Sequence, residues 1–476
     1  MTGEEARTEV RSALLERAIS RMRSAWRDLT SQGRLPSRAP VRADLPDDDL
    51  PTLKRQIAAC VEGAGGEVSA RARAAELGRV YLSLSGSGKE RFFNLLARDF
   101  GVDDEVVNAA VEALKRAGDA EARLRAQARL RAALTPPYVG LLAQFNGLPS
   151  GVKFVVDLRT ELRETVGDDP HLRALDDNLR ELLTGWFDIG LLRLERITWH
   201  APAALLEKLA AYEAVHRVRS WQDLKNRLDS DRRFYAFFHP SMPDEPLIFV
   251  EVALVDGLAD NIQALLDRDA PADDPKSANA AIFYSISNAQ RGLVGLSFGG
   301  FLIKRVLDDL SRELPTLKTF ATLSPLPGFR NWVERRIAAG DDTLLTAPAA
   351  KALRAFEPDA ASTAELLGKL LDGPWHRNEA LSDALEAPML RLAARYLLTA
   401  KQGNEPLDRV ARFHLNNGAR VERLNWRGDN SPNGLKQSFG LMVNYRYRPE
   451  EIEANHEAYR GEGRIAAAPA VRALLG

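Results

Sequence analysis

The sequence predicts an α+β protein in which an all-helical N-terminal domain, residues 1–190, precedes a domain of mixed strands and helices, residues 191–476. Two observations lead to this prediction. Through the first domain, apolar residues recur at the three- and four-residue spacing of amphipathic helices. After about residue 200, short aromatic and β-branched runs alternate with turn residues and helical segments. With 476 residues, the chain is also longer than a single core usually supports.

Helical periodicity extends through most of the N-terminal domain. The first helix has its apolar stripe at Leu14, Leu15, Ala18, Met22 and Ala25. Residues 103–134 and 152–186 repeat the pattern, and breaks rich in Pro and Gly separate them. Residues 33–51 are rich in Pro, Arg and Asp, which predicts an exposed connection. Because no fixed-period repeat occurs, the sequence does not indicate a solenoid.

Six segments of the second domain have the composition of β-strands: residues 233–238, 247–254, 281–287, 319–323, 421–426 and 441–445. A proline-rich turn joins the first two and indicates a hairpin. A helix is expected at 300–313, and residues from about 340 to 400 return to helical periodicity. The second domain is therefore predicted to be a mixed α/β structure.

The composition limits the classes of function. The net charge is −1, with 45% hydrophobic and 28% charged residues, which fits a folded protein without an overall field for nucleic acid or an anionic membrane. No window reaches the roughly 18 apolar residues of a membrane span. We expect a cytoplasmic protein, because neither end of the sequence has the pattern of a secretory, mitochondrial or peroxisomal signal. Cys60 is the single cysteine and no His-x-x-x-His pair occurs, so we expect no metal site.

Residues 86–89, Gly-Ser-Gly-Lys, invite comparison with a phosphate-binding loop, because the strand-like residues 80–84 precede them. That loop needs a glycine where this chain has Ser83. It also needs Ser or Thr after the lysine, to hold magnesium, where this chain has Glu90. The segment is therefore not expected to bind a nucleotide.

Residues 295–299 form the pattern Gly-x-Ser-x-Gly, the nucleophile elbow of α/β hydrolases, with Ser297 at its centre. A strand precedes the pattern and a helix follows it. However, seven residues separate the strand from the pattern, whereas the strained elbow comes directly off the strand end. The helical N-terminal domain also lacks the parallel strands of a hydrolase. A nucleophilic Ser297 is the weaker interpretation.

The same segment has a second interpretation, as a loop that binds a phosphate group. Four glycines lie between the predicted strand and the predicted helix: Gly292, Gly295, Gly299 and Gly300. Glycine allows backbone N–H groups to approach a ligand closely, and a helix N-terminus adds partial positive charge. Acetyltransferases bind the pyrophosphate of CoA in this way, although Leu293 replaces the first glycine of their pattern. A tight turn without a ligand remains the alternative.

Two further residues have the setting of catalytic groups. Ser324 ends the strand predicted at 319–323, and a loop with two prolines and a glycine follows it. A hydroxyl held rigidly at a strand end suits catalysis, but an ordinary turn serine has the same features. His414 lies in the last turn of a helix that Gly418 would end. Because helix C-terminal carbonyl groups favour an imidazolium, His414 is a candidate proton donor near neutral pH. A simple complement to the helix dipole is the alternative.

Several blocks of the second domain, taken together and in this order, closely resemble the malonyl-CoA decarboxylase family. They extend from about Leu194 to the C-terminus, and the helical half matches in general character. The blocks are residues 238–240 with 244–254, 281–287, 301–306, 323–329, 413–419 and 440–447.

The resemblance implies a helical domain used in oligomerisation and a catalytic domain of the acetyltransferase (GNAT) fold. It implies a catalytic serine at Ser324, in the block Leu-Ser-Pro-Leu-Pro-Gly-Phe, and a catalytic histidine at His414, in Phe-His-Leu-Asn-Asn-Gly-Ala. Tyr447 is a pocket candidate, although a core aromatic is the simpler interpretation. The implied CoA-binding loop is Val294, Gly295, Leu296, Ser297, Phe298, Gly299 and Gly300.

Eukaryotic members of the family commonly have Glu where Ser297 stands, so a role of that Glu does not transfer to this chain. They also have additional cysteines and a peroxisomal ending. The resemblance therefore points to a bacterial-type member without disulfide-linked subunits, and to a homotetramer or another homo-oligomer. The implied substrate is malonyl-CoA, with no further cofactor, because the thioester is itself the electron sink.

The mechanism expected on this basis is loss of CO2 from malonyl-CoA to give the enolate of the acetyl thioester. Ser324 would orient the malonyl carboxylate, and His414 would polarise the thioester or donate a proton. Two other classes remain open. One is an acyl-CoA hydrolase or transferase that uses Ser297. The other is a non-catalytic sensor of malonyl-CoA.

Overall fold

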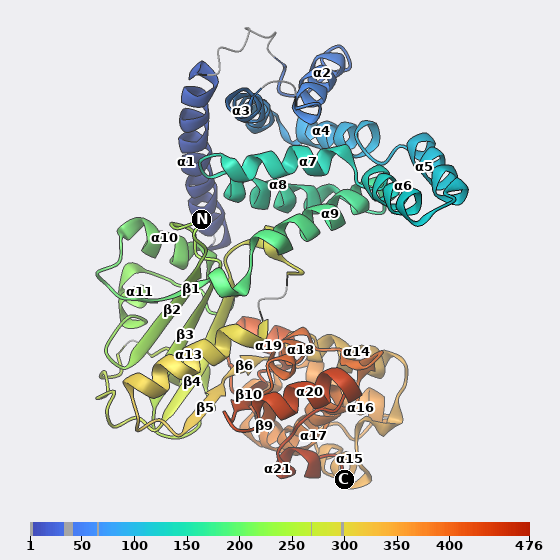
Figure 1. Cartoon of the computed structure of the whole chain (residues 1–476). Helices are drawn as coiled ribbons and strands as arrows, with labels where there is room; N and C mark the ends of the chain where they lie inside the picture. The colour runs from blue at the N-terminus through green and yellow to red at the C-terminus, as the bar shows by residue number, and fades with distance from the viewer. Residues whose placement is uncertain (1–2, 33–40, 64–65, 268, 297–298) are drawn as a thin grey trace.

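A computed structural model describes residues 3–32, 41–63, 66–267, 269–296 and 299–476. It shows an α+β protein, with a helical N-terminal part followed by a part built around a mixed β-sheet (Figure 1). The last helix of the N-terminal part ends at Trp186, and the first strand begins at Arg193. No described helix is both long and apolar enough to cross a membrane.

The N-terminal helices agree with the predicted periodicity but are shorter than predicted. Residues 103–134 and 152–186 each form two helices, because aspartates within each range accept backbone N–H groups and begin a second helix. The caps are Asp119 and Asp169. The helices are α1 (Gly3–Gln32), α2 (Leu50–Val61), α3 (Glu67–Ser83), α4 (Gly86–Asp99), α5 (Asp104–Arg116), α6 (Ala120–Ala133), α7 (Pro137–Gln144), α8 (Gly151–Thr165) and α9 (Pro170–Trp186).

The strand expected at 80–84 is wrong, because these residues complete α3. Tyr81 and Leu82 are buried one helical turn after Leu77 and Gly78, on the face of α3 that packs against the core. A short apolar run at a helix end cannot be distinguished from a buried strand by a five-residue window. The glycine-rich residues that follow begin α4, where Ser85 caps the helix through the N–H of Gly88.

The sheet has the order β1-β2-β3-β4-β5-β10-β6, and β9 pairs with the other edge of β10. All neighbours are antiparallel except β4 and β5, which are parallel. The strands are β1 (Arg193–Ile197), β2 (Arg232–Phe238), β3 (Ile248–Val255), β4 (Ala280–Asn288), β5 (Thr319–Thr322), β6 (Ser324–Pro325), β9 (Arg420–Asn425) and β10 (Met442–Tyr447). The short pair β7 (Lys401–Gln402) and β8 (Glu405–Pro406) forms a separate ribbon.

All six predicted strands are present, with boundaries shifted by one or two residues. The sequence did not predict β1, because three of its five residues are exposed and charged, as is usual for an edge strand. It also ended the last strand at Tyr445, whereas β10 continues to Tyr447. This extension matters below, because Tyr447 lies next to His414.

Helices cover both faces of the sheet and fill the C-terminal part (Figure 1). Val250 and Val252 of β3 share a core cluster with Val306 of α13, whereas Phe249 and Ala253 point to the opposite face. The remaining helices are α10 (Ala203–Tyr212), α11 (Trp221–Asn226), α12 (Ile262–Leu265), α13 (Gly299–Glu313), α14 (Phe329–Ala338), α15 (Ala347–Leu353), α16 (Thr363–Asp372), α17 (Glu379–Leu398), α18 (Arg409–Asn416), α19 (Pro432–Ser438), α20 (Ile452–Glu462) and α21 (Pro469–Ala473).

An interruption in the sheet positions the site described next. β5 and β6 pair with the same edge of β10, one after the other, and Leu323 separates them. The pairing of β4 with β5 covers Ala280 to Phe283 only. Among the described strands, none pairs with that edge of β4 from Tyr284 onward. The unpaired part of this edge of β4 therefore begins close to Ser324.

Candidate active site

Ser324 and His414 contact each other, although 90 positions separate them in the sequence. The Oγ of Ser324 lies 3.1 Å from Nε2 of His414. Ser324 starts β6 and His414 lies in the last turn of α18, so two separate elements bring the pair together. Both side chains are buried. The structure thus joins the two residues that the sequence selected independently.

The hydroxyl of Ser324 has a second partner, Thr322. Ser324 Oγ donates to Thr322 Oγ1 at 2.9 Å, and the same oxygen accepts the backbone N–H of Tyr445 at 3.1 Å. The Thr322 side chain therefore replaces a ladder hydrogen bond where the strand is interrupted. The amide of Asn444 holds the backbone there by donating to Thr322 O at 2.7 Å. The position of Ser324 follows from this local break in the sheet.

Aromatic side chains of β10 surround the imidazole of His414. The Oη of Tyr447 lies 2.7 Å from Nδ1, on the side of the ring opposite Ser324. The ring of Tyr445 is stacked on the imidazole, with centroids 4.6 Å apart and an interplanar angle of 22°. Tyr445 and Tyr447 are both buried. Tyr447 is therefore a hydrogen-bonding neighbour of His414 and not only a core aromatic.

Burial lowers the pKa of His414 to about 3. The expectation of an imidazolium at this helix end is therefore wrong. The helix does end here, with Gly418 at φ +76°. However, the desolvation penalty for a charged imidazole in this buried position is larger than the stabilisation that the C-terminal carbonyl groups of the helix provide. His414 is a neutral imidazole near pH 7.

The hydrogen bonds indicate which ring nitrogen carries the proton. A serine hydroxyl has one proton, and Ser324 donates it to Thr322. The bond between Ser324 Oγ and His414 Nε2 must then be donated by Nε2–H. With Nε2 protonated, the neutral ring accepts at Nδ1, and the phenol of Tyr447 is the donor. The contacts thus form one directed chain from Tyr447 through His414 and Ser324 to Thr322.

Asp408 connects the elements that carry the two central residues. Its Oδ1 accepts the N–H groups of Val410 and Ala411, both at 2.9 Å, and so begins α18. Its side chain also accepts the backbone N–H of Gly328, in the loop that follows Ser324. Burial raises the pKa of this carboxyl, and Tyr396 donates to Oδ2 at 3.3 Å. One carboxylate therefore holds the serine loop against the histidine helix.

The predicted CoA-binding loop follows β4 and leads into α13. Val294 is exposed, Gly295 has φ +88°, and Gly299 and Gly300 form the first turn of α13. Leu296 packs against the main core. Ser297 and Phe298 lie outside the described residues. The loop is in contact with α8, and α13 packs against α18, which carries His414.

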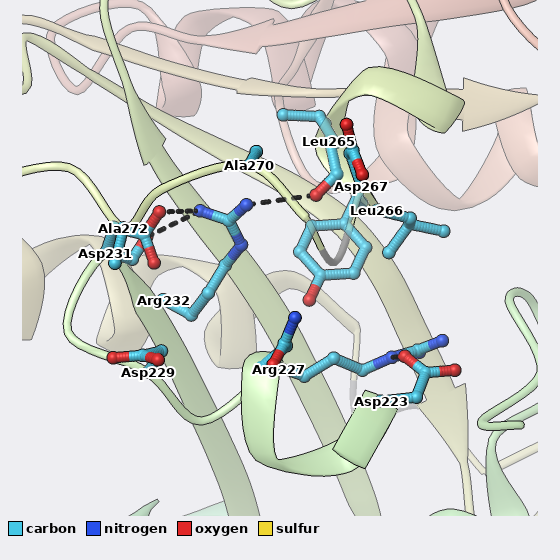
Figure 2. Close-up of a pocket in the computed structure, with 12 residues that line it drawn as sticks. Asp223, Arg227, Asp229, Asp231, Arg232, Leu265, Leu266, Asp267, Ala270 and Ala272 are labelled. Atoms are coloured by element: carbon cyan, nitrogen blue, oxygen red, sulfur yellow. Dashed lines mark hydrogen bonds and ion pairs between the residues drawn. The ribbon is translucent and has the colours of Figure 1, made fainter. Parts of the chain in front are cut away.

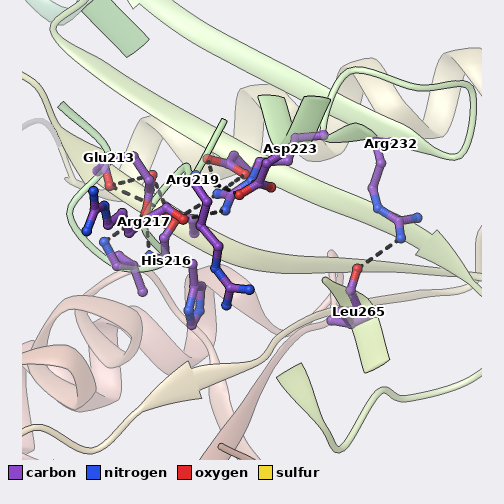
Figure 3. Close-up of polar contacts among 12 residues, drawn as sticks. Glu213, His216, Arg217, Arg219, Asp223, Arg232 and Leu265 are labelled. Carbon is purple, nitrogen blue, oxygen red and sulfur yellow. Dashed lines mark hydrogen bonds and ion pairs between the residues drawn. The ribbon is translucent and has the colours of Figure 1, made fainter. Parts of the chain in front are cut away.

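A second polar cluster lies on the face of the sheet opposite α13. Glu213 accepts from the hydroxyls of Ser285, at 2.9 and 2.8 Å, and of Ser287, at 3.1 Å. Arg227 contacts Glu251 at 3.2 Å and Asp223 at 3.0 Å. Figure 3 shows part of this cluster, with Glu213, His216, Arg217 and Asp223 labelled.

Burial in this cluster disfavours the charged form of its carboxyl groups, as Glu251 shows. Burial raises the pKa of Glu251 to about 8, against the opposing effect of Arg227. The adjacent cavity has a volume of about 120 Å³, with Asp223, Arg232 and Tyr284 in its lining (Figure 2). Ligand sites of drug size usually have about 300–1,000 Å³. We therefore interpret the cluster as a structural brace of β3 and β4.

The sequence did not indicate Thr322, and it made Tyr447 a pocket candidate for which a core aromatic was the simpler interpretation. No local pattern identifies Thr322, because its role depends on the break between β5 and β6. Tyr447 had a usable signal, since its block also carries Asn444, which fixes the backbone beside Thr322. Both residues become recognisable only when β10 is placed next to β5.

Two family profiles match the chain. The profile of the malonyl-CoA decarboxylase C-terminal domain matches residues 190–476, and that of the N-terminal domain matches residues 100–187. Mitochondrial malonyl-CoA decarboxylases of Anser anser anser and Rattus norvegicus are each 39% identical to the chain. These alignments cover 85% and 88% of this chain, and 84% and 85% of the relatives.

Solved structures give the same result. A crystal structure of malonyl-CoA decarboxylase from Rhodopseudomonas palustris is 44% identical, with a TM-score of 0.80 over 90% of this chain and 99% of that chain. The corresponding structure from Agrobacterium vitis is 40% identical, with a TM-score of 0.78 over 89% of this chain and 100% of that chain. Because profiles, relatives and structures agree over most of its length, the chain belongs to the malonyl-CoA decarboxylase family.

Proposed function

We propose that the chain decarboxylates malonyl-CoA to acetyl-CoA and CO2, and that Ser324, His414 and Tyr447 perform the chemistry. The observation that carries this assignment is the buried, directed chain of hydrogen bonds through His414. In the reaction, the bond between the malonyl carboxylate carbon and the α-carbon breaks. Its electron pair moves into the thioester enolate, and CO2 leaves. The α-carbon then takes up one proton.

The neutral state of His414 favours one of its two expected roles. A neutral imidazole is a poor acid but a good hydrogen-bond donor, and such a donor can stabilise an enolate without being protonated. In the substrate complex, Nε2–H would donate to the thioester oxygen in place of Ser324 Oγ. The hydroxyl of Tyr447 would donate to Nδ1 and so keep the proton on Nε2.

Ser324 would orient the malonyl carboxylate, which it can reach from the point where β4 and β5 separate. Breaking the C–C bond requires the carboxylate to lie out of the plane of the thioester, so that the electron pair enters the enolate. The proton for the α-carbon is assigned to the Ser324–His414 pair, which regains it from solvent. The balance is one malonyl carboxylate and one proton in, and CO2 and acetyl-CoA out.

We assign the sheet to the acetyltransferase fold and residues 294–300 to binding of the CoA pyrophosphate. Three features support this assignment. The parallel pairing of β4 with β5 ends at Phe283, and beyond it no described strand pairs with the backbone N–H groups on this edge of β4. Glycine-containing residues follow β4, and the N-terminus of α13 comes next. On this assignment Ser297 belongs to the CoA-binding segment and is not a nucleophile.

We also propose a bacterial-type, cytoplasmic enzyme that forms a homotetramer or another homo-oligomer through its helical part. The similarity to structures from R. palustris and A. vitis supports the first point. The burial of Cys60 in α2 supports subunits that are not joined by a disulfide. Light scattering after size exclusion, with and without reductant, tests the assembly: a mass that falls on reduction would contradict it.

The function is tested by incubating the purified protein with malonyl-CoA in D2O and analysing the acyl-CoA products by mass. A decarboxylase gives acetyl-CoA with one deuterium on the methyl group. A hydrolase that uses Ser297 gives free CoA and malonate, and a sensor leaves malonyl-CoA unchanged. Either of these two results would contradict the proposal.

A further inference from the structure

A residue of the helical part, Arg159, hydrogen-bonds the backbone of the loop between β4 and α13. Arg159 of α8 is completely buried, and its Nη1 donates to Gly292 O at 2.7 Å and to Val294 O at 3.0 Å. The same guanidinium forms a two-pronged ion pair with Asp176 of α9, through Nε at 2.8 Å and Nη2 at 3.2 Å. One side chain therefore connects α8, α9 and the loop.

The backbone of the loop also packs directly on α8. A Cβ atom at Gly292 would lie 1.9 Å from the carbonyl oxygen of Val156, so only glycine fits there. Thr160 Oγ1 would lie 3.0 Å from the same atom. Because the backbone of Gly292 lies directly against the backbone of α8, this contact fixes how closely the loop approaches α8. The hydrogen bonds of Arg159 and the close contact at Gly292 therefore show independently that α8 positions the loop.

The direction of the Arg159 bonds determines where the loop presents its donors. A trans peptide is planar, and its C=O and N–H point in opposite directions. Arg159 holds the carbonyl of Val294 towards α8, so the N–H of Gly295 points away from α8. The positive φ of Gly295 then turns the chain at this residue. Arg159 itself is neutralised by Asp176, so it serves to orient the loop rather than to attract an anion.

We propose that Arg159 is a positioning residue for the CoA-binding loop, and that the helical part thereby belongs to the substrate-binding machinery. This inference rests on the proposed function, because it takes Val294, Gly295 and the N-terminus of α13 as part of the site of the CoA pyrophosphate. The arrangement affects the nucleotide end of the substrate. It does not touch Ser324 or His414, whose hydrogen bonds involve other elements.

The experiment compares two substrates, malonyl-CoA and malonyl-pantetheine, which lacks the pyrophosphate and the nucleotide. For Arg159→Met we expect KM for malonyl-CoA to rise at least tenfold, since small displacements of a binding element cost one to two orders of magnitude. We expect kcat to stay within about threefold of wild type, and kcat/KM for malonyl-pantetheine to stay unchanged, because neither depends on the pyrophosphate contacts. Arg159→Lys keeps the charge but cannot reach both carbonyls and Asp176, so its KM should also rise.

The matched control is Lys89→Met, which removes an ion pair of 2.8 Å between Lys89 of α4 and Glu161 of α8. This change disturbs α8 two residues from Arg159 without touching the loop, and both substrates should keep their wild-type KM. Should Arg159→Met not fold, Asp176→Asn provides the same test, because it removes the carboxylate that orients the guanidinium.

Three outcomes are decisive. A KM increase confined to malonyl-CoA supports the inference. An equal loss of kcat/KM for both substrates, or an unchanged KM for malonyl-CoA, overturns it and makes Arg159 a structural residue. If wild-type protein forms no acetyl-CoA from either substrate, the proposed function fails instead, and the two failures are thereby distinguished.

Discussion

Nδ1 of His414 lies 2.7 Å from the hydroxyl of Tyr447, while Tyr445, two positions earlier on the same strand, stacks its ring on the imidazole. The two tyrosines lie on the same face of β10, but their hydroxyls differ. The Oη of Tyr445 has no hydrogen-bond partner among the described residues, whereas the Oη of Tyr447 bonds the ring. This difference gives a matched pair of substitutions for testing the site.

Tyr447→Phe should lower kcat by about tenfold or more while the protein remains folded. Burial raises the pKa of this phenol, so Tyr447 stays protonated and can donate to Nδ1. Without that donor the ring proton can move from Nε2 to Nδ1, and the ring then has no Nε2–H to donate. A hydrogen-bond partner at one ring nitrogen commonly selects the active tautomer of a histidine in this way. ¹⁵N NMR of labelled protein reports the tautomer directly. Tyr445→Phe is the control and should leave both kcat and the tautomer unchanged; equal effects of the two variants would contradict the directed chain.

His414→Ala should lower kcat by about 100-fold to 10,000-fold, the range of a positioned acid–base or hydrogen-bonding group. His414→Gln retains a neutral N–H donor near the position of Nε2. If stabilisation of the enolate is the main role, the glutamine variant should keep clearly more activity than the alanine variant. Steady-state release of CO2 from malonyl-CoA measures both. An alanine variant with more than a tenth of wild-type activity would remove His414 from the mechanism.

The buried imidazole should make stability depend on pH between about 3 and 6.5. The pKa of His414 is about 3 in the folded protein and near 6.5 when the chain is unfolded. Below pH 6.5 the unfolded chain binds a proton that the folded protein does not, so the free energy of unfolding falls as the pH decreases towards 3. Above pH 6.5 this contribution is complete and constant. Urea unfolding at several pH values, compared with His414→Gln, isolates the effect; identical slopes for both proteins would show that His414 is not the group responsible.

Thr322→Val should lower both activity and stability, whereas Thr322→Ser should be close to wild type. Valine has nearly the shape of threonine but cannot accept from Ser324 Oγ and from the N–H of Tyr445. An unsatisfied buried donor costs about 1–3 kcal/mol in the free energy of unfolding. Serine keeps the accepting oxygen. Thermal unfolding and kcat are the measurements. A valine variant as active as the serine variant would show that Thr322 does not hold the Ser324 hydroxyl in place.

Arg227→Met should reduce the free energy of unfolding by about 3–5 kcal/mol, because it leaves Glu251 and Asp223 buried without their cation. The double variant Arg227→Met with Glu251→Met should be more stable than the single variant, since it leaves one buried carboxyl group, that of Asp223, without the cation instead of two. Chemical denaturation measures both. Arg217→Met, which alters an exposed side chain of the same loop, is the control. A double variant less stable than the single one would contradict a brace held mainly by charge pairing.

Much of the fold could be predicted from local sequence patterns. The strands at 233–238 and 281–287 have β-branched and aromatic composition, which reports local backbone preference and burial together. The helices of the N-terminal part were found from their apolar periodicity, although the split at Asp119 depended on a cap that a long window averages away. The wrong predictions lie where these signals are weak, at the charged edge strand β1 and at the last turn of α3, where the apolar run is short.

The pair Ser324 and His414 was identified by a different route. Residue chemistry alone left Ser324 a turn residue and His414 a helix-end charge, and the family blocks raised both to catalytic assignments. The structure then added their contact at 3.1 Å. It also changed the protonation state of His414, because desolvation depends on every element packed around the ring and not on its own helix.

The sequence by itself determined the α+β class, six strands of the sheet and the family, since each is recorded in patterns along the chain. Only the tertiary structure decided that Tyr447 and Thr322 belong to the site, that His414 is neutral, and that Arg159 holds the loop after β4. Each of these depends on hydrogen bonds or burial between segments far apart in the sequence, from 33 positions between His414 and Tyr447 to 133 between Arg159 and Gly292. The strength of a hydrogen bond and the burial of a side chain depend on which groups lie close together in space, and a local sequence pattern does not record that.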